Sequence, residues 1–320
     1  ECFVAPEGWS CVQIDFSQLE IYVTAWLTGD EAMTKDLLSG IDFHCLRLSW
    51  ASSMSDGKSY EEIVQLAKVD EVDEWALKRS KAKTISYQKA YGAGARSLAE
   101  STGLHIDDVK ELLDKEDRIY YRVKAFNDYV YQQVENTAEY SHKDYIPALL
   151  KKGGKNGRRF DKSGYELLPI KQGNNTYFEA DNFRNVGYFQ SITGKRYAFE
   201  EFAVIDKQGK TRRCFSPTQT KNYQIQGTAS DVQAITTAAL LPLLLKHSDK
   251  VRFINEIHDS KCFYVKDEYL DLIVGKLCAI MESTPKLFKK YLNIDMPFSI
   301  PVDAEVGKNF ASLITYRRKL

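Results

Sequence analysis

Two aspartates stand where predicted strands meet turns, and their carboxylates could hold metal ions. Asp15 ends a short alternating segment over residues 10–15, and Asp259 lies in a tight turn between two further predicted strands. If neighbouring strands of one sheet carry them, the pair could share divalent cations that activate an attacking hydroxyl and stabilise a leaving oxygen. Each aspartate could equally cap its own turn, so the pair alone leaves both interpretations open.

A stripe of two cations and two aromatic rings is the second candidate, on a helix predicted over residues 74–91. Its members recur at every fourth position: Arg79, Lys83, Tyr87 and Tyr91. Successive members differ by only about 40° on a helix of about 3.6 residues per turn, so they share one face. Cations followed by rings suit a ligand with phosphates at one end and a planar base at the other. A solvated basic face beside two core tyrosines would show the same spacing.

Charged residues are segregated along the chain, although 44 Lys and Arg cancel 44 Asp and Glu overall. Residues 1–77 carry 15 acidic and 4 basic side chains, whereas residues 150–213 carry 14 basic and 7 acidic ones. This asymmetry favours a cation site beside a polyanion-binding region, although solvated helix faces would also produce it. Zero net charge therefore does not exclude a nucleic-acid partner.

The composition excludes several classes of protein. Hydrophobic residues make up 43% of the 320 residues, which excludes wholesale disorder and allows one large domain or two. No apolar run approaches the ~18 residues of a membrane helix, so no membrane partner is expected. The six cysteines include no CxxC pair and no zinc-site spacing, which is typical of reduced thiols in a cytoplasmic protein.

Short strands and long helices are the elements expected to position these residues. After the strand over residues 10–15, a helix over 17–27 is predicted with Ser17 as its N-cap, because Glu20 follows at the spacing of a capping box. A stretch rich in Gly, Lys, Arg and Asn over 151–185 indicates an exposed insertion with short strands. The other expected elements are helices over 107–140, 222–247 and 267–291 and strands over 251–257 and 261–265.

Four segments give these observations a common interpretation. In chain order they are 15–20 (DFSQLE), 79–87 (RSKAKTISY), 222–231 (NYQIQGTASD) and 258–260 (HDS). They resemble motif A, motif B, the QGTA helix and motif C of family A DNA polymerases, the class of bacterial DNA polymerase I and T7-like phage replicases. The resemblance runs from about residue 6 to residue 310, with an interruption at about 141–185.

The resemblance implies an α+β fold, namely the palm and fingers of a right-hand polymerase. The palm would be an antiparallel sheet with helices and the fingers mainly helical, while the thumb and exonuclease domains would be absent from this chain. The implied limits are 1–60 and 215–320 for the palm, with the motif C hairpin at 251–265, and 61–214 for the fingers, with the O helix at 74–91 and a basic insertion at 141–185.

The resemblance also implies roles for the matching residues. Asp15, Asp259 and the carbonyl of Phe16 would bind two Mg²⁺ ions, for which Mn²⁺ could substitute, and Glu20 would be the steric gate against a ribose 2′-OH. Arg79 and Lys83 would act with the two aspartates as catalytic residues. The implied nucleotide-binding residues are Phe16, Gln18, Glu20, His44, Arg79, Lys83 and Tyr87. The implied template- and primer-binding residues are Tyr91, Asn222, Gln226 and His258.

The implied activity is template-directed DNA synthesis, in which a primer 3′-OH attacks the α-phosphate of a deoxynucleotide and pyrophosphate leaves. The implied partners are primer–template DNA, dNTP and either a second polypeptide that carries the thumb and exonuclease domains or other replisome proteins. The chain would then be the C-terminal part of a split, processed or truncated phage replicative polymerase that works in the cytoplasm of a host bacterium.

Two alternatives remain open. A single-subunit RNA polymerase shares the palm aspartates and the basic helix, but it should leave room for the 2′-OH where this chain has Glu20. A non-catalytic replisome or DNA-binding subunit is the other alternative, because motif C has Ser260 where the family usually has Glu.

Overall fold

The chain divides into two compact units, each with its own core. Unit 1 comprises Glu1–Gly40 and Ile225–Leu320, and unit 2 comprises Ile41–Gln224. The computed structural model describes residues 4–90, 93–142, 159–160, 166–172, 175–180, 183–205 and 211–317. The assignment of palm and fingers to the ranges expected above stays a prediction.

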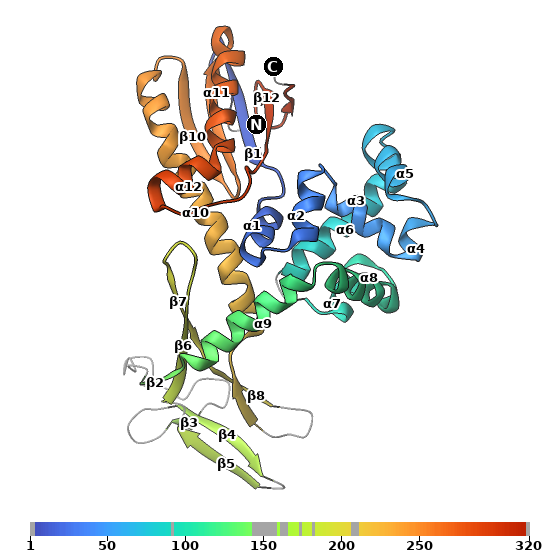
Figure 1. Ribbon diagram of the computed structural model, residues 1–320, viewed down its shortest axis with the longest axis vertical. Coiled ribbons are helices and arrows are strands. Elements are labelled where there is room, and N and C mark those ends of the chain that lie inside the picture. The colour runs from blue at the N-terminus through green and yellow to red at the C-terminus, as the bar shows by residue number, and fades with distance from the viewer. Residues whose placement is uncertain are drawn as a thin grey trace. The chain divides into compact units, whose positions relative to one another are not determined.

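Unit 1 contains a five-stranded antiparallel sheet in the order β10-β11-β1-β12-β13 (Figure 1). The central strand, β1, pairs with β11 on one side and β12 on the other. Its consecutive residues Cys11 and Val12 point to opposite faces and are both fully buried, so both faces of the sheet are covered. The strands are β1 (Trp9–Phe16), β10 (Val251–Ile257), β11 (Ser260–Lys266), β12 (Val302–Gly307) and β13 (Ile314–Thr315).

The helices of unit 1 bury apolar stripes. On α11 the stripe is spaced at about one turn, and this helix packs against β1, β11 and β12. Trp26 of α1 meets Phe288 of α12 edge to face, with ring centroids 5.1 Å apart. The elements are α1 (Leu19–Thr28), α2 (Glu31–Leu38), the 3₁₀ turn η3 (Asp267–Tyr269), α11 (Leu270–Glu282) and α12 (Thr284–Leu292).

A single long helix, α10 (Pro217–Lys246), contributes residues to both units. Among the described helices it alone is long and apolar enough to cross a membrane by length and composition. Its Val232, Thr236 and Leu240 are fully buried within the protein, as in the core helix of a globular domain. The absence of a membrane partner stays a prediction.

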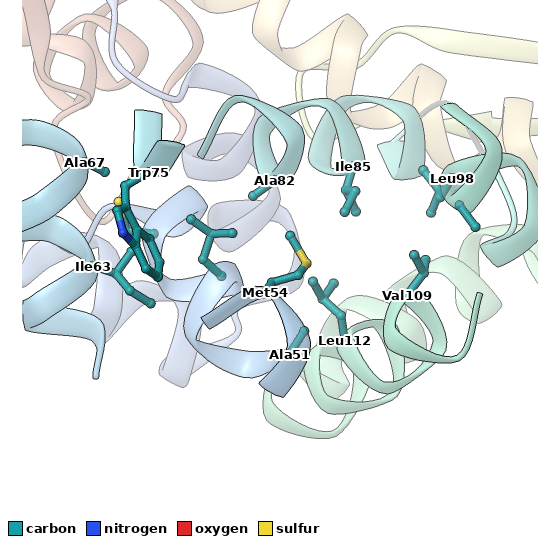
Figure 2. Close-up of a cluster of buried hydrophobic side chains, with 13 residues drawn as sticks. Ala51, Met54, Ile63, Ala67, Trp75, Ala82, Ile85, Leu98, Val109 and Leu112 are labelled. Carbon is teal, nitrogen blue, oxygen red and sulfur yellow. The ribbon is translucent and has the colours of Figure 1, made fainter. Parts of the chain in front are cut away.

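An apolar core cluster of unit 2 is built from residues of the successive helices α3 to α8. From α6, Trp75, Ala82 and Ile85 point into this apolar cluster, where Trp75 lies beside Ile63 (Figure 2). Beside that buried face of α6, Arg79 is half-buried and Lys83 is exposed. The helices are α3 (Phe43–Trp50), α4 (Ser52–Ser55), α5 (Tyr60–Val64), the π-helix η1 (Gln65–Val69), α6 (Asp73–Ala90), α7 (Ala95–Thr102), α8 (Ile106–Ile119) and α9 (Tyr121–Asn136).

Three small antiparallel sheets complete unit 2, with strand orders β2-β6-β7, β3-β4-β5 and β8-β9. The segment predicted to be an insertion with short strands contains β3, β4 and β5, and its other parts include positions outside the described residues. The strands are β2 (Glu139–His142), β3 (Arg159–Phe160), β4 (Glu166–Gln172), β5 (Asn175–Ala180), β6 (Phe183–Gln190), β7 (Arg196–Glu200), β8 (Phe202–Ile205) and β9 (Thr211–Cys214).

Three local expectations need correction. Ser17 is not the N-cap of α1: Gln18 occupies that position with φ 55°, and the hydroxyl of Ser17 instead donates to Asp303 Oδ2 at 2.5 Å. The helix expected over 107–140 is two helices, because the backbone at Tyr120 leaves the helical region between α8 and α9. Likewise, the helix expected over 267–291 breaks at Ser283.

A methyl group at position 187 is expected to destabilise unit 2. A Cβ on Gly187 of β6 would lie 2.1 Å from the carbonyl oxygen of Val134 in α9, so Gly187→Ala should cost about 1–3 kcal/mol in the free energy of unfolding. Gly275→Ala is the matched control, because its Cβ would meet no atom within 4 Å and Ala favours the helix. Urea unfolding of both variants checks this, and equal midpoints would contradict the close approach.

Candidate active site

The acidic edge is the end of the unit 1 sheet that carries Asp15, Phe16, Asp259 and Asp303. Asp15 lies opposite Ser260 of β11 and opposite Asp303 of β12, and the Phe16 N–H donates to the carbonyl of Asp259 at 3.3 Å. Asp259 directly precedes Ser260, the residue that pairs with Asp15. The two aspartates predicted to bind metal are therefore neighbours in space.

The turn that carries Asp259 has an unusual backbone. His258 adopts the left-handed region at φ 54°, which costs free energy for a residue other than glycine and occurs often at functional sites. Ser260 is buried, and its hydroxyl donates to the carbonyl of Ile257 at 2.9 Å. The residue that replaces the usual motif C Glu therefore closes the turn, while the His258 side chain is exposed.

Glu20 and Gln18 lie next to the acidic edge in sequence. Burial, and then the negative charge of Asp259, raise the pKa of Glu20, which places its carboxyl within electrostatic reach of the motif C aspartate. Gln18 is left-handed at φ 55°, and its Oε1 is buried with no hydrogen-bond partner among the described residues. A buried acceptor without a donor is costly, so this oxygen is available to a ligand.

The donors at the acidic edge suit a hard cation. Asp15 and Asp259 supply carboxylate oxygens and Phe16 a carbonyl, which are oxygen ligands of the kind that Mg²⁺ takes when substrate phosphates complete its shell. Within the part of the chain that the structure describes, no three His, Cys, Asp or Glu side chains form a ready metal site. The oxygen donors of Asp15, Asp259 and Phe16 fit Mg²⁺ by their chemistry.

In unit 2, the predicted phosphate ligand Arg79 is held by Asp42. Its Nη2 donates to Asp42 Oδ2 at 2.7 Å, and its Nε lies 3.2 and 3.3 Å from the two carboxylate oxygens. Asp42 also caps α3 by accepting from the N–H groups of His44 and Cys45. Burial opposes ionisation of Asp42, but hydrogen bonds from Arg79 and Cys45 prevail and hold its pKa well below the usual range.

His44 lies close to the same cations. Burial lowers its pKa to about 4, the negative charge of Asp42 opposes this shift, and the charges of Arg47, Arg79 and Lys83 add to it. The imidazole is therefore neutral at pH 7. Three of the predicted nucleotide-binding residues, His44, Arg79 and Lys83, thus share one region of unit 2, where Lys83 is exposed.

The other predicted residues are placed as follows. Tyr87 lies in α6, and its side chain is outside the described residues, as is the whole of Tyr91. Asn222 and Gln226 are one turn apart on α10, where Asn222 is buried and Gln226 half-buried.

Sequence reasoning did not single out three residues that the structure brings to these sites. Asp303 faces Asp15 only through strand pairing between residues 288 positions apart, which no local pattern reveals. Asp42 is not among the predicted site residues, although its place before His44 at a helix start is a visible N-cap signal. Lys261 follows Ser260 directly, and a lysine immediately before the run Cys262–Val265 is the signal that could have found it.

A family model described as DNA polymerase family A matches residues 1–148 and 175–312. The chain belongs to DNA polymerase family A. The internal unmatched segment, 149–174, falls within the predicted insertion.

Individual relatives agree with this membership. The thermostable DNA polymerase I of Thermus aquaticus is 22% identical over 305 residues, which cover 95% of this chain and 27% of that protein. The DNA polymerase of Mycobacterium phage D29 is 29% identical over 126 residues, 39% of this chain and 18% of the relative. The chain thus spans about a quarter of the length of the Thermus aquaticus polymerase.

A solved structure confirms the predicted fold class. The POL domain of Pol1 from M. smegmatis, solved in complex with DNA primer–template and dNTP, superposes with a TM-score of 0.59 at 16% sequence identity. The match covers 96% of this chain and 41% of that chain. The α+β polymerase fold expected from the four motifs is therefore confirmed.

Proposed function

We propose that the chain catalyses template-directed DNA synthesis, in which a deoxynucleotide is added to a primer 3′-OH and pyrophosphate is released. One observation carries the proposal: in a member of this family, Asp15 is the penultimate residue of β1 and Asp259 lies in the turn directly before the paired strand β11. The proposed palm is 1–60 with 215–320, and the proposed fingers are 61–214.

Two Mg²⁺ ions, or Mn²⁺ in their place, are the proposed cofactors, held by the carboxylates of Asp15 and Asp259 and the carbonyl of Phe16. When bound, such ions favour ionisation of the attacking hydroxyl and neutralise charge on the phosphates. Arg79 and Lys83 bind the triphosphate, and Asp42 orients the guanidinium of Arg79. His44, being neutral, donates an N–H without adding a charge.

Chelation of divalent cations is expected to abolish primer extension. The two aspartates would otherwise face the triphosphate as uncompensated negative charges, so excess EDTA should stop synthesis and added Mg²⁺ or Mn²⁺ should restore it. Denaturing gels of extended primer check this. Extension at an unchanged rate in EDTA would contradict the proposed cofactors.

Glu20 is the proposed steric gate, and its truncation should relax sugar selection. Glu20→Ala is expected to raise the ratio of ribonucleotide to deoxynucleotide incorporation by roughly 10²-fold, because the space taken by the side chain becomes free for a 2′-OH. Single-nucleotide insertion with rGTP and dGTP measures the ratio, and Glu7→Ala, which changes an exposed residue, is the control. An efficient use of rGTP by the unaltered chain would favour the RNA polymerase alternative.

A second polypeptide that carries the thumb and exonuclease domains is the proposed partner, together with primer–template DNA and dNTP. A phage DNA polymerase is among the proteins to which the chain is similar. Processivity measured with and without an upstream polypeptide tests this. Long products from this chain alone would contradict the need for a partner.

A further inference from the structure

Lys261 of β11 is a fully buried lysine two residues after Asp259. Its side chain has 0% exposure, whereas lysine is almost never fully buried unless it is paired. The neighbours that follow it on the strand, Cys262 and Phe263, are buried as well. An ammonium group therefore interrupts the apolar interior of the unit 1 sheet.

The ammonium has four acceptors on two other elements. From α10 they are the carbonyl of Gln233 at 3.3 Å, its Oε1 at 2.7 Å and the hydroxyl of Thr237 at 2.7 Å. From β10 it is Glu256 Oε2 at 2.6 Å, and Thr237 also donates to that oxygen at 2.7 Å. Lys261 thus joins β11 to both its neighbouring strand and the helix that packs on it.

Stability alone does not explain this arrangement. Removing a charge from water costs free energy that the ion pair must offset, and a well-packed apolar residue at such a position is often as stable or more so. A network in which every bond has a fixed direction instead specifies one position for the groups that it joins. The network therefore restricts where the β10–β11 hairpin can lie on α10.

The turn that carries Asp259 is the part of the hairpin whose position this network would restrict. His258 is exposed and left-handed, Ile257 is 46% exposed, and the hydroxyl of Ser260 donates to the carbonyl of Ile257 within the turn itself. Lys261 and Glu256 pair across the hairpin one step from the turn. Through Lys261 they attach the hairpin to Gln233 and Thr237 of α10.

We propose that Lys261 is a positioning residue that fixes the Asp259 turn on α10 and so sets the separation of the two metal-binding carboxylates. The inference rests on the proposed function. It has added weight in this chain because Ser260 supplies no third carboxylate, which leaves two side chains to define the site.

Lys261→Met is the test, since it removes the charge and keeps an unbranched chain of similar length. In primer extension with the upstream polypeptide, we expect kcat to fall at least tenfold and the Mg²⁺ concentration for half-maximal rate to rise several-fold, with less than threefold change in KM for dNTP. Without DNA or turnover, Mn²⁺ binding followed by electron paramagnetic resonance should weaken by a similar factor, and hydrogen exchange at residues 257–260 should accelerate.

Two further variants make the test specific. Thr237→Val removes one acceptor at constant shape and should shift Mn²⁺ binding in the same direction by a smaller factor, even if Lys261→Met fails to fold. Lys276→Met changes an exposed lysine of α11 and should leave every readout unchanged. Unchanged Mn²⁺ affinity and unchanged exchange in folded Lys261→Met and Thr237→Val would overturn the inference. If the unaltered assembly makes no DNA, the proposed function fails, and the Mn²⁺ and exchange measurements still decide the role of Lys261.

Discussion

Asparagine at position 259 is expected to reduce the rate of primer extension by roughly 10³-fold or more, because it removes several kcal/mol of charge stabilisation at a metal site. The substitution preserves the size of the side chain and the backbone carbonyl that accepts from Phe16. Asp15→Asn should have a comparable effect. Since both residues would serve one metal site, the double variant should be hardly worse than either single variant.

The control for this loss is Asp267→Asn. Asp267 is also a carboxylate of the unit 1 sheet region, but it pairs with Lys308 and Ser10 at the opposite end of β1 from Asp15. We expect the Asp267→Asn variant to extend primers at a rate within about twofold of wild type, because an exposed ion pair contributes little to the free energy of unfolding. Full activity of Asp15→Asn and Asp259→Asn would leave the non-catalytic subunit as the better interpretation.

Glutamine at position 116 is expected to lower the free energy of unfolding of unit 2 by about 3–5 kcal/mol, because it leaves a buried guanidinium without its counter-charge. Glu116 of α8 accepts from Arg47 Nη2 at 2.7 Å and from its Nε at 3.1 Å, and both side chains are less than a tenth exposed. Lys89 is a second cation beside this carboxylate, with its Nζ 3.4 Å from Glu116 Oε2. Urea unfolding followed by circular dichroism measures the loss.

The same pair predicts a dependence on pH. Burial would raise the pKa of Glu116, but the charges of Arg47 and Lys89 prevail and lower it to about 2. Since an unfolded Glu titrates near about 4.3, the contribution is complete above that pH and is lost as the pH falls towards 2. Glu116→Gln should lack this part of the acid transition. The double variant Arg47→Met with Glu116→Leu should recover most of the stability, and a double variant as unstable as Glu116→Gln would contradict the charge argument.

Local sequence signals were sufficient for the parts of the site that lie on single elements. Strand-end aspartates, a tight turn and a four-residue stripe on a helix all depend on neighbours within a few positions, so Asp15, Asp259 and the Arg79–Lys83 face could be predicted. The motif order added the family and the fold class.

Partners that are distant in sequence could not be predicted. Ser17 has the sequence signal of an N-cap, yet its hydroxyl bonds to Asp303, 286 positions away, and this tertiary bond overrides the local preference. Lys261 and its acceptors on α10 meet only because β11 packs against that helix. The metal-binding, nucleotide-binding and template-binding roles stay predictions, as do the cytoplasmic location and the split arrangement.

The central position of β1 has a consequence for synthesis of the protein in the cell. Asp15 of this strand pairs with Ser260 and Asp303, so the sheet cannot close until a further 288 residues have been made after Asp15. At about 5–20 residues per second, β1 emerges roughly 15–60 s before its last partner. Unit 2 is continuous in sequence from Ile41 to Gln224 and can fold during that interval. Nascent β1, with its buried apolar residues still unpaired, is therefore the segment for which chaperone binding to the growing chain would matter most.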